Sequence, residues 1–247
     1  MRVAVAGGTG LAGARVADRL RSDGHEPVVL ARSRGVDLVT GQGLHDALAD
    51  CAAVVDASNV TTQRRATAVR FFGTAAANLT AAAARAGVGH LVVLSIVGID
   101  RVDLGYYAGK RRQEEVVTGG PVPWTVLRTT QFTEFAGQVL GRSRGPLAVV
   151  PRMLYQPVAV DEVADRLAEL ATGAPAGWVR PLAGPEPLQL PDMARAVLRA
   201  RGSRRVVVPV RLPGAVGRAL ATGGLLPDGE ADLGQQTFAG LVGAAAA

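Results

Sequence analysis

The first half of the chain predicts an α/β fold, a doubly wound parallel sheet with helices on both of its faces. Short runs rich in valine and alanine alternate with longer segments of helical period, which is the pattern of repeated strand-helix-strand units. The short runs are apolar at successive positions, as expected for strands that are buried on both faces. Glycines stand where the helical segments should end, at Gly24 and Gly87.

These patterns place each element in order along the chain. The expected strands are 2–6, 27–31, 52–56, 90–95 and 123–128, and the expected helices between them are 11–22, 44–49, 63–86 and 107–118.

Beyond residue 128 the rhythm loosens, with glycine and proline at shorter intervals. Asp161 is expected to cap a helix that runs through Leu167, Pro191 to open a helix over 191–201, and Pro213 to open a third. No linker separates the two parts, so we expect a core over 1–128 and a smaller part over 129–247 that is built onto it. The last five residues, 243–247, are expected to fray.

Composition excludes several classes of protein. Nearly half of the 247 residues are apolar and the mean hydropathy is +0.21, but charges interrupt the apolar runs before they could span a membrane. The single cysteine, Cys51, cannot form an internal disulfide. The first strand begins directly after Met1 and leaves no room for a signal peptide, so we expect a cytoplasmic protein without a membrane partner.

The charge pattern argues against nucleic acid as a partner. Twenty-seven basic residues exceed 21 acidic ones, but basic pairs such as Arg111-Arg112 are scattered and aromatic residues make up only 4%. Among the basic residues, Lys110 is the single lysine, which suggests that arginine cannot replace it there. The three histidines are far apart in sequence, and we expect no metal site.

A glycine-rich turn joins the first strand to the first helix. It reads Gly7-Gly8-Thr9-Gly10-Leu11-Ala12-Gly13. In a dinucleotide-binding turn of the Rossmann type, the first glycine allows a tight turn, the second lets the backbone approach a pyrophosphate, and the third lets helix and strand pack closely. We therefore assign Gly7, Thr9, Gly10, Leu11 and Gly13 to a cofactor site. The alternative is an ordinary glycine-rich connection.

The end of the second expected strand carries Arg32 and Ser33 and has no acidic residue. An NAD site usually places a carboxylate here for the ribose 2′-hydroxyl, whereas an arginine accommodates the 2′-phosphate of NADP. We therefore predict NADP(H) as the cofactor, held by Arg32 and Ser33. The alternative is a solvated loop arginine in an arginine-rich protein.

Tyr106 and Lys110 stand four residues apart at the start of a predicted helix, so they share one face. This spacing, together with the GxxGxxG turn, resembles the short-chain dehydrogenase/reductase superfamily. The resemblance implies that Tyr106 is the catalytic acid or base, that Lys110 binds the nicotinamide ribose and lowers the pKa of Tyr106, and that Ser95 orients the substrate carbonyl. The alternative is an aromatic plug at a helix start.

The resemblance narrows to the atypical NmrA-like branch and covers nearly the whole chain. It rests on 91–98, on 106–114, on 124–132 and on later pieces such as 156–164 and 182–186. It implies that Asp37 and the loop of Ala57, Ser58 and Asn59 border the adenine and its ribose, and that Thr129 to Phe132 approach the nicotinamide. Asp37 as a turn acid and Asn59 as a helix cap are the alternatives.

One departure concerns the long third helix. Phe71 stands where extended members of the superfamily carry an asparagine before the Gly-Thr pair, so a proton relay through that position should be absent. Asn78, further along the helix, is expected to pack or cap locally.

Two functional hypotheses follow. The first is an NADPH-dependent reductase of a carbonyl or quinone, with Tyr106 as proton donor and a small apolar substrate bound by residues after 129. The second is a non-catalytic NADP(H)-binding redox sensor, because the branch contains such members. An epimerase or dehydratase shares the fold, but no residue selects it. Helix 63–86 is long enough to offer a pairing face for a homodimer.

Overall fold

The computed structural model describes residues 1–244 and divides the chain into two compact units. Unit 1 comprises Met1–Ile96, Leu104–Arg128 and Val160–Arg180, and unit 2 comprises Val97–Asp103, Thr129–Ala159 and Pro181–Ala247. The expected fraying of the terminal alanines falls largely outside the described residues. The division differs from the expected boundary after residue 128, because the helix over 160–172 packs on the first helix of unit 1.

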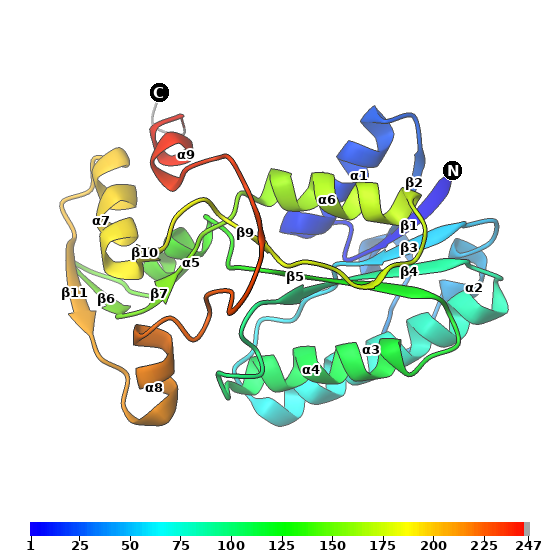
Figure 1. The fold of residues 1–247 in the computed structure, drawn as a ribbon, viewed down its shortest axis with the longest axis horizontal. Coiled ribbons are helices and arrows are strands. Elements are labelled where there is room, and N and C mark those ends of the chain that lie inside the picture. Colours follow the sequence, from blue (N-terminus) through cyan, green and yellow to red (C-terminus); the bar gives the residue numbers. More distant parts are fainter. Residues whose placement is uncertain (245–247) are drawn as a thin grey trace. The chain divides into compact units, whose positions relative to one another are not determined.

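A parallel sheet forms the centre of unit 1 (Figure 1). Its strands follow the order β8-β5-β4-β3-β1-β2, in which β8 and β5 pair in parallel and β1 lies between β2 and β3. The strands are β1 Arg2–Ala6, β2 Glu26–Leu30, β3 Ala53–Asp56, β4 His90–Ile96, β5 Trp124–Thr129 and β8 Gly177–Trp178. The five strands expected from the sequence are confirmed within one residue at each end.

Helices cover both faces of this sheet, which confirms the doubly wound arrangement. Helices α1 and α6 contact each other on one face, and α3 and α4 contact each other on the other (Figure 1). The helices of unit 1 are α1 Leu11–Ser22, α2 Leu44–Ala47, α3 Arg65–Arg85, α4 Gly105–Thr118 and α6 Val160–Thr172, with the short 3-10 helix η1 Arg32–Arg34. Helix α6 starts one residue before Asp161, which therefore lies in its first turn and not at the cap.

The sequence explains why these strands lie at the centre. All four residues of β3 are buried, as are Val3 to Ala6 of β1. Side chains of α3, such as Leu79 and Ala83, pack in the same core cluster as strand residues such as Leu91 and Val126. These strands are apolar at successive positions and have no polar face that could point to solvent. They are therefore covered by helices on both sides of the sheet.

Unit 2 contains shorter elements. A parallel pair, β6 and β11, and an antiparallel pair, β7 and β10, form two small sheets, while β9 pairs with β12 and, through Leu182, with Thr129. The elements are α5 Phe135–Gly141, β6 Leu147–Pro151, β7 Leu154–Tyr155, β9 Leu182–Ala183, β10 Leu188–Gln189, α7 Leu190–Ala200, β11 Val206–Val210, α8 Gly214–Ala221, β12 Asp232–Leu233 and α9 Phe238–Ala244.

The two helix starts expected in this region are confirmed. Pro191 lies in the first turn of α7, where its missing N–H costs nothing, and Pro213 is the N-cap of α8. Within residues 1–244, no helix has both the length and the hydropathy that a membrane span needs.

Candidate active site

The glycine-rich turn after β1 is closely packed. Gly7 has φ of +73°, and a side chain there would place its Cβ 2.7 Å from the carbonyl oxygen of Ala57. A Cβ on Gly13 would overlap the carbonyl oxygen of Gly7. Backbone therefore fills the space that any side chain would need at both positions, and glycine is required for the turn and for the contact of α1 with it.

The N-terminus of α1 is open. Gly10 is the N-cap and supplies no side-chain hydrogen bond, the first turn contains no acidic residue, and Thr9, Gly10 and Leu11 are exposed. The first N–H groups of a helix have no partner within the helix and carry a partial positive charge. The turn therefore presents a positive surface without acidic side chains to an anionic group.

Arg32 and Ser33 follow the end of β2 in η1, and both are exposed. Neither side chain makes a hydrogen bond or ion pair with another residue of the described chain. The guanidinium of Arg32 is therefore available to an external anion beside the open turn of unit 1.

Asp37 has a local structural task. Its Oδ1 accepts hydrogen bonds from the backbone N–H of Val39 at 2.7 Å and of Thr40 at 3.2 Å. Asn78 of α3 donates to the carbonyl oxygens of Leu38 and Val39, both at 2.9 Å, which agrees with the expected local packing of Asn78. Asp37 therefore acts as an acid that stabilises a turn, which was the alternative interpretation of this residue. Its role toward adenine stays a prediction.

The loop after β3 is fixed by a buried carboxylate. Asp56 is fully buried, and its Oδ1 accepts from the backbone N–H of Ser58 at 3.0 Å. The backbone N–H of Ala57 donates to the carbonyl oxygen of Ala6 at 3.1 Å. The Oγ of Ser58 is buried and has no hydrogen-bond partner within residues 1–244. This loop therefore lies against the glycine turn with one polar group left to satisfy.

Tyr106 lies in the first turn of α4 and faces this loop. Its hydroxyl donates to Oδ1 of Asn59 at 2.8 Å. Its ring packs edge-to-face on Phe72, with ring centroids 5.6 Å apart. Burial raises the pKa of Tyr106 to about 12. The resemblance implied a lower pKa for Tyr106, and burial acts in the opposite direction.

Lys110 is 4% exposed, and its ammonium lies within a polar network. Nζ donates to the carbonyl oxygen of Leu94 at 2.6 Å and to Oε1 of Gln113, and it lies 4.9 Å from the centre of the Phe72 ring. Burial lowers the pKa of Lys110 to about 8, and Asp56 and Glu114 oppose this shift. At neutral pH the ammonium is therefore largely charged inside the unit.

Gln113 connects this cation to the loop after β3. Its Nε2 donates to Oδ2 of Asp56 at 2.6 Å, while its Oε1 accepts from Lys110. Asp56 and Gln113 were not among the residues predicted for the site. The sequence could have indicated both residues. Asp56 is a carboxylate at the end of an apolar strand, where a buried charge needs a partner, and Gln113 lies one helical turn beyond Lys110 on the same face.

Two further groups border this region. Ser95 is fully buried, and its Oγ has no hydrogen-bond partner in the part of the chain that the structure describes. Glu114 forms a bidentate pair with Arg128, with Nε and Nη2 at 2.8 and 2.7 Å from the two carboxylate oxygens. That pair ties α4 to β5.

The two residues expected at the nicotinamide belong to unit 2. The carbonyl oxygen of buried Thr129 accepts from the backbone N–H of Val97 at 2.9 Å. Phe132 is half-buried and bridges to Val158. In the described chain, no group of three or more His, Cys, Asp or Glu side chains could hold a metal ion.

A parallel sheet with an open glycine turn at its first helix defines a dinucleotide-binding protein of the Rossmann-like class. Its family follows from the sequence profile for NAD(P)H-binding proteins, which matches residues 7–172. The chain belongs to this NAD(P)H-binding family. No curated protein is significantly similar to it.

Several solved structures share the fold. The NADPH-dependent quinone oxidoreductase QOR2 of Escherichia coli, complexed with NADPH, has a TM-score of 0.71 at 18% identity and covers 98% of this chain and 99% of its own. The triphenylmethane reductase of Citrobacter sp. with NADP(H) scores 0.67 at 18% identity and covers 91% of both chains. The UDP-glucose 4-epimerase of Thermus thermophilus with NAD scores 0.69 at 21% identity and covers 85% of this chain and 87% of its own. These similarities establish the fold.

The residues of unit 1 fit the cofactor of the family. The exposed turn carries no acidic side chain, the N-terminus of α1 offers donors, and the exposed guanidinium of Arg32 lies one strand away. The unpartnered Oγ of Ser58 supplies a further polar group beside the turn.

Proposed function

We propose that this protein is an NADPH-dependent oxidoreductase that reduces a carbonyl or quinone group of a small apolar substrate, with Tyr106 as the proton donor. The observation that carries the proposal is the hydrogen bond from the Tyr106 hydroxyl to Asn59. This bond places a titratable hydroxyl at the loop after β3, which lies against the glycine turn. The chain belongs to a family of NAD(P)H-binding proteins, so the hydroxyl is beside the turn where we expect the cofactor.

In this proposal the cofactor is held mainly by backbone. Gly7, Thr9, Gly10, Leu11 and Gly13 hold the pyrophosphate, and Ala57, Ser58, Asn59 and Asp37 border the adenosine. Lys110 binds the nicotinamide ribose, and Thr129 and Phe132, which belong to unit 2, keep their predicted role toward the nicotinamide. The bound cofactor supplies the hydride.

Arg32 and Ser33 set the preference for NADPH. A 2′-phosphate carries close to two negative charges and accepts hydrogen bonds, and a planar guanidinium without an internal partner can meet it with two parallel donors. The 2′-hydroxyl of NADH offers neither the charge nor the second acceptor, and no carboxylate lies in η1 to receive it.

The protonation state of Tyr106 favours reduction over oxidation. With its pKa raised to about 12, the phenol holds its proton at neutral pH and can donate it to the substrate oxygen as that oxygen gains negative charge. The ammonium of Lys110 is held by Leu94 and Gln113 and not by the Tyr106 oxygen, so we assign it to the nicotinamide ribose. Ser95 donates a second hydrogen bond to the same substrate oxygen.

The first test is a fluorescence titration with NADPH and NADH. We expect the wild-type protein to bind NADPH more tightly, and Arg32→Gln to lose roughly 10- to 100-fold in NADPH affinity while NADH binding is unchanged. Arg85→Gln, which removes an exposed charge at the end of α3, is the matched control and should bind both cofactors normally. Equal loss for both cofactors in Arg32→Gln would overturn the assignment of the 2′-phosphate.

The second test adds a panel of quinones and aldehydes to the NADPH-loaded protein. Tyr106→Phe should lower turnover by about 10²- to 10⁴-fold with little change in NADPH affinity, because it removes a proton donor and no binding group. The neighbouring Tyr107→Phe is the control and should keep its activity. Unchanged turnover in Tyr106→Phe would exclude this residue as the donor.

A second candidate function is a non-catalytic NADP(H) sensor. One observation favours it: the Tyr106 hydroxyl is bonded to Asn59 while the Lys110 ammonium is bonded to Leu94 and Gln113, so the two groups are not paired with each other. Tight NADPH binding with no oxidation by any member of the panel would favour the sensor, and absence of binding would contradict both functions.

A further inference from the structure

The parallel pair β6 and β11 in unit 2 has an apolar outward face. Alternate residues of the two strands point to this face and stand side by side in register, Leu147 with Val206, Val149 with Val208 and Pro151 with Val210. Leu147, Val149 and Val206 are 53, 51 and 58% exposed, and the other three are half-buried. We call these six side chains the apolar ribbon face. The opposite side, with Ala148, Val150 and Val207, is buried where α7 contacts both strands.

Arginines lie at both ends of the apolar ribbon face. Because the strands are parallel, Arg144 and Arg204 precede them at one end, and Arg152 and Arg211 follow them at the other. The backbone N–H of Arg152 donates to the carbonyl oxygen of Val210 at 2.8 Å, which places these two chain positions together. All four arginines are exposed, and none has an ion-pair or hydrogen-bond partner for its side chain among residues 1–244.

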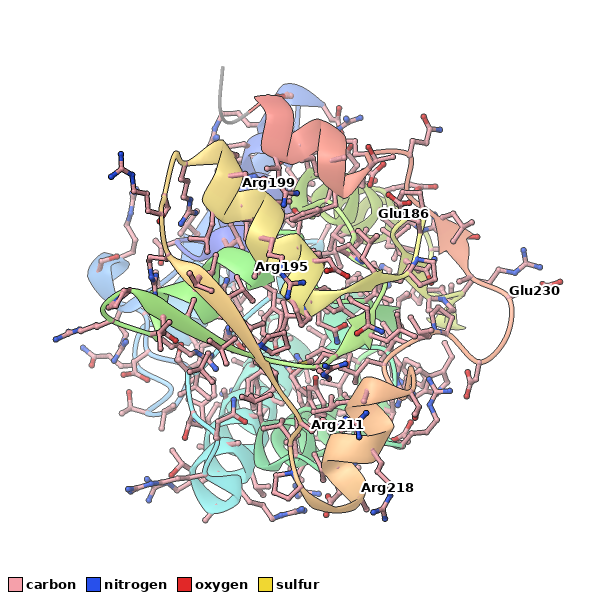
Figure 2. The ribbon with its side chains drawn as sticks, turned by 90° about the vertical axis from the view of Figure 1, so that its left-hand side faces the viewer. Glu186, Arg195, Arg199, Arg211, Arg218 and Glu230 are labelled. Carbon is pink, nitrogen blue, oxygen red and sulfur yellow. The ribbon has the colours of Figure 1, made fainter. Side chains whose placement is uncertain are left out.

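The surrounding surface has the same sign of charge. Residues 142–159 and 181–218 of unit 2 contain ten arginines and two acidic residues, Glu186 and Asp192. Figure 2 views this end of unit 2, with Arg195 and Arg199 on α7 toward the start of β11 and Arg211 and Arg218 near α8 beyond its end. Arg195 is paired with Asp192 at 2.6 Å, and Arg205 donates to three backbone carbonyls. The side chains of the other eight arginines have no hydrogen-bond or ion-pair partner within the described residues.

The three contacts of Arg205 also fix the shape of this surface. Its guanidinium donates to the carbonyl oxygens of Leu140 at 3.1 Å, Ser143 at 2.6 Å and Gly145 at 3.0 Å. These bonds satisfy the end of α5 and the turn that leads into β6. The turn that leads into β6, one of the two strands that carry the apolar ribbon face, is therefore held in place by these hydrogen bonds.

Charge and apolar surface together restrict what can cover this face. A second copy of the same patch would bring unpaired arginines against arginines, which is unfavourable in a two-fold interface. A nucleic-acid backbone would match the arginines but would leave the six apolar side chains against phosphates. A protein interface would be expected to use aromatic anchors, and neither strand contains Trp, Tyr or Phe.

We propose that the apolar ribbon face docks this protein on an anionic phospholipid surface. In this arrangement the framing arginines contact lipid phosphates, and short side chains such as Leu147, Val149 and Val206 enter the interfacial layer beneath the headgroups. Shallow insertion of a few aliphatic side chains gives weak, reversible binding. The proposal is independent of the reaction proposed above and differs from the sequence expectation of no membrane partner, because β6 and β11 resemble buried strands when only their composition is considered.

The test is sedimentation of the full-length protein with vesicles. We expect binding to vesicles of phosphatidylglycerol and phosphatidylcholine at 0.1 M salt, little binding to phosphatidylcholine alone, and release at 1 M salt, where the Debye length falls to about 3 Å. Arg144→Gln/Arg204→Gln should weaken the partition coefficient about 25-fold, since each arginine near an anionic surface contributes a factor of about five. Arg70→Gln/Arg85→Gln removes the same charge from α3 of unit 1 and should lose much less.

The apolar contribution is tested separately. Val149→Ser/Val206→Ser changes two exposed side chains, so the fold should be kept, and vesicle binding should fall by roughly 10-fold or more. Leu233→Ser, at a side chain that is 59% exposed on β12, is the control and should bind as the wild type does. No binding to the phosphatidylglycerol vesicles would overturn the proposal. Equal loss in Leu233→Ser, or a solution dimer that dissociates in Val149→Ser/Val206→Ser, would also overturn it.

Discussion

Arginine is used differently in two regions of the molecule, on α1 beside α6 in unit 1 and around β6 and β11 in unit 2. In unit 1, arginines of α1 reach acids of α6: Arg15 lies 2.5 Å from Asp161 and Arg19 lies 3.1 Å from Asp165. A groove of about 510 Å³ between these helices is lined largely by such charged side chains. In unit 2, the arginines around β6 and β11 have almost no acids near them in sequence, and eight have no partner among residues 1–244.

This difference shows that net charge alone does not indicate a binding surface. The whole chain carries a formal charge of +6, and its basic residues look scattered along the sequence. In three dimensions, acids of α6 pair with arginines of α1, whereas eight arginines around one small sheet of unit 2 have no side-chain partner among residues 1–244. Whether a basic surface can bind a partner therefore depends on how many of its arginines are already ion-paired within the protein, and not on the net charge of the whole chain.

The largest expected effect concerns the ion pair between Arg128 and buried Glu114 in unit 1. Arg128→Met removes the partner of Glu114, which is only 6% exposed, and should lower the free energy of unfolding by about 3 kcal/mol because a buried carboxylate is left uncompensated. Urea unfolding measures this loss. The double variant Arg128→Met/Glu114→Leu should recover most of it, and a double variant as unstable as the single one would contradict the explanation.

The next effect is the pH dependence that Lys110 produces. Its folded pKa of about 8 lies below the ordinary value of 10.5, so between these values the unfolded chain binds a proton that the folded chain has lost. Stability therefore rises with pH from 8 to 10 relative to Lys110→Met, on the order of 1–3 kcal/mol. Urea unfolding at pH 7, 8, 9 and 10 provides the comparison. Parallel pH profiles for the two proteins would show that Lys110 titrates normally.

A smaller effect is expected for the exposed ion pairs that join α1 and α6. Arg15→Gln should cost at most about 1 kcal/mol at low salt, because both partners remain largely solvated. The difference from the wild type should disappear at 1 M NaCl, where screening removes the attraction. A loss that persists at high salt would point to packing by the arginine stem instead.

The smallest effect is expected in unit 2. Arg211→Gln or Arg204→Gln should change the free energy of unfolding by no more than about 0.5 kcal/mol, since neither side chain has a partner to lose in the described chain. Thermal unfolding of both variants beside Arg15→Gln checks the contrast directly. If Arg204→Gln were as destabilised as Arg15→Gln, the distinction between the two units would fail.

The core of unit 1 could be predicted from the sequence because its signals are local. Apolar runs such as 52–56 and the glycine breakers Gly24 and Gly87 fixed five strands and the long helices to within a few residues. Helix α6 was also predicted, but not that it belongs to unit 1. That assignment depends on contacts between α1 and α6, and the pairing of Arg19 with Asp165 spans 146 residues.

The candidate site was predictable in its residue types but not in its connections. The spacing of Tyr106 and Lys110 identified both residues, yet it could not show that their polar atoms point to different partners. Gln113 and Asp56 are 57 residues apart, and no periodicity links them. The apolar ribbon face was missed for a related reason: β6 and β11 have the composition of interior strands, and exposure depends on what packs against them.

The contact between Gly7 and Ala57 has a consequence for engineering. Because backbone of the loop after β3 occupies the space beside Gly7, the two segments form one steric module, and neither can be grafted into another scaffold without the other. A redesign of cofactor preference is therefore better directed at Arg32 and Ser33, whose exposed side chains can be exchanged without disturbing that module.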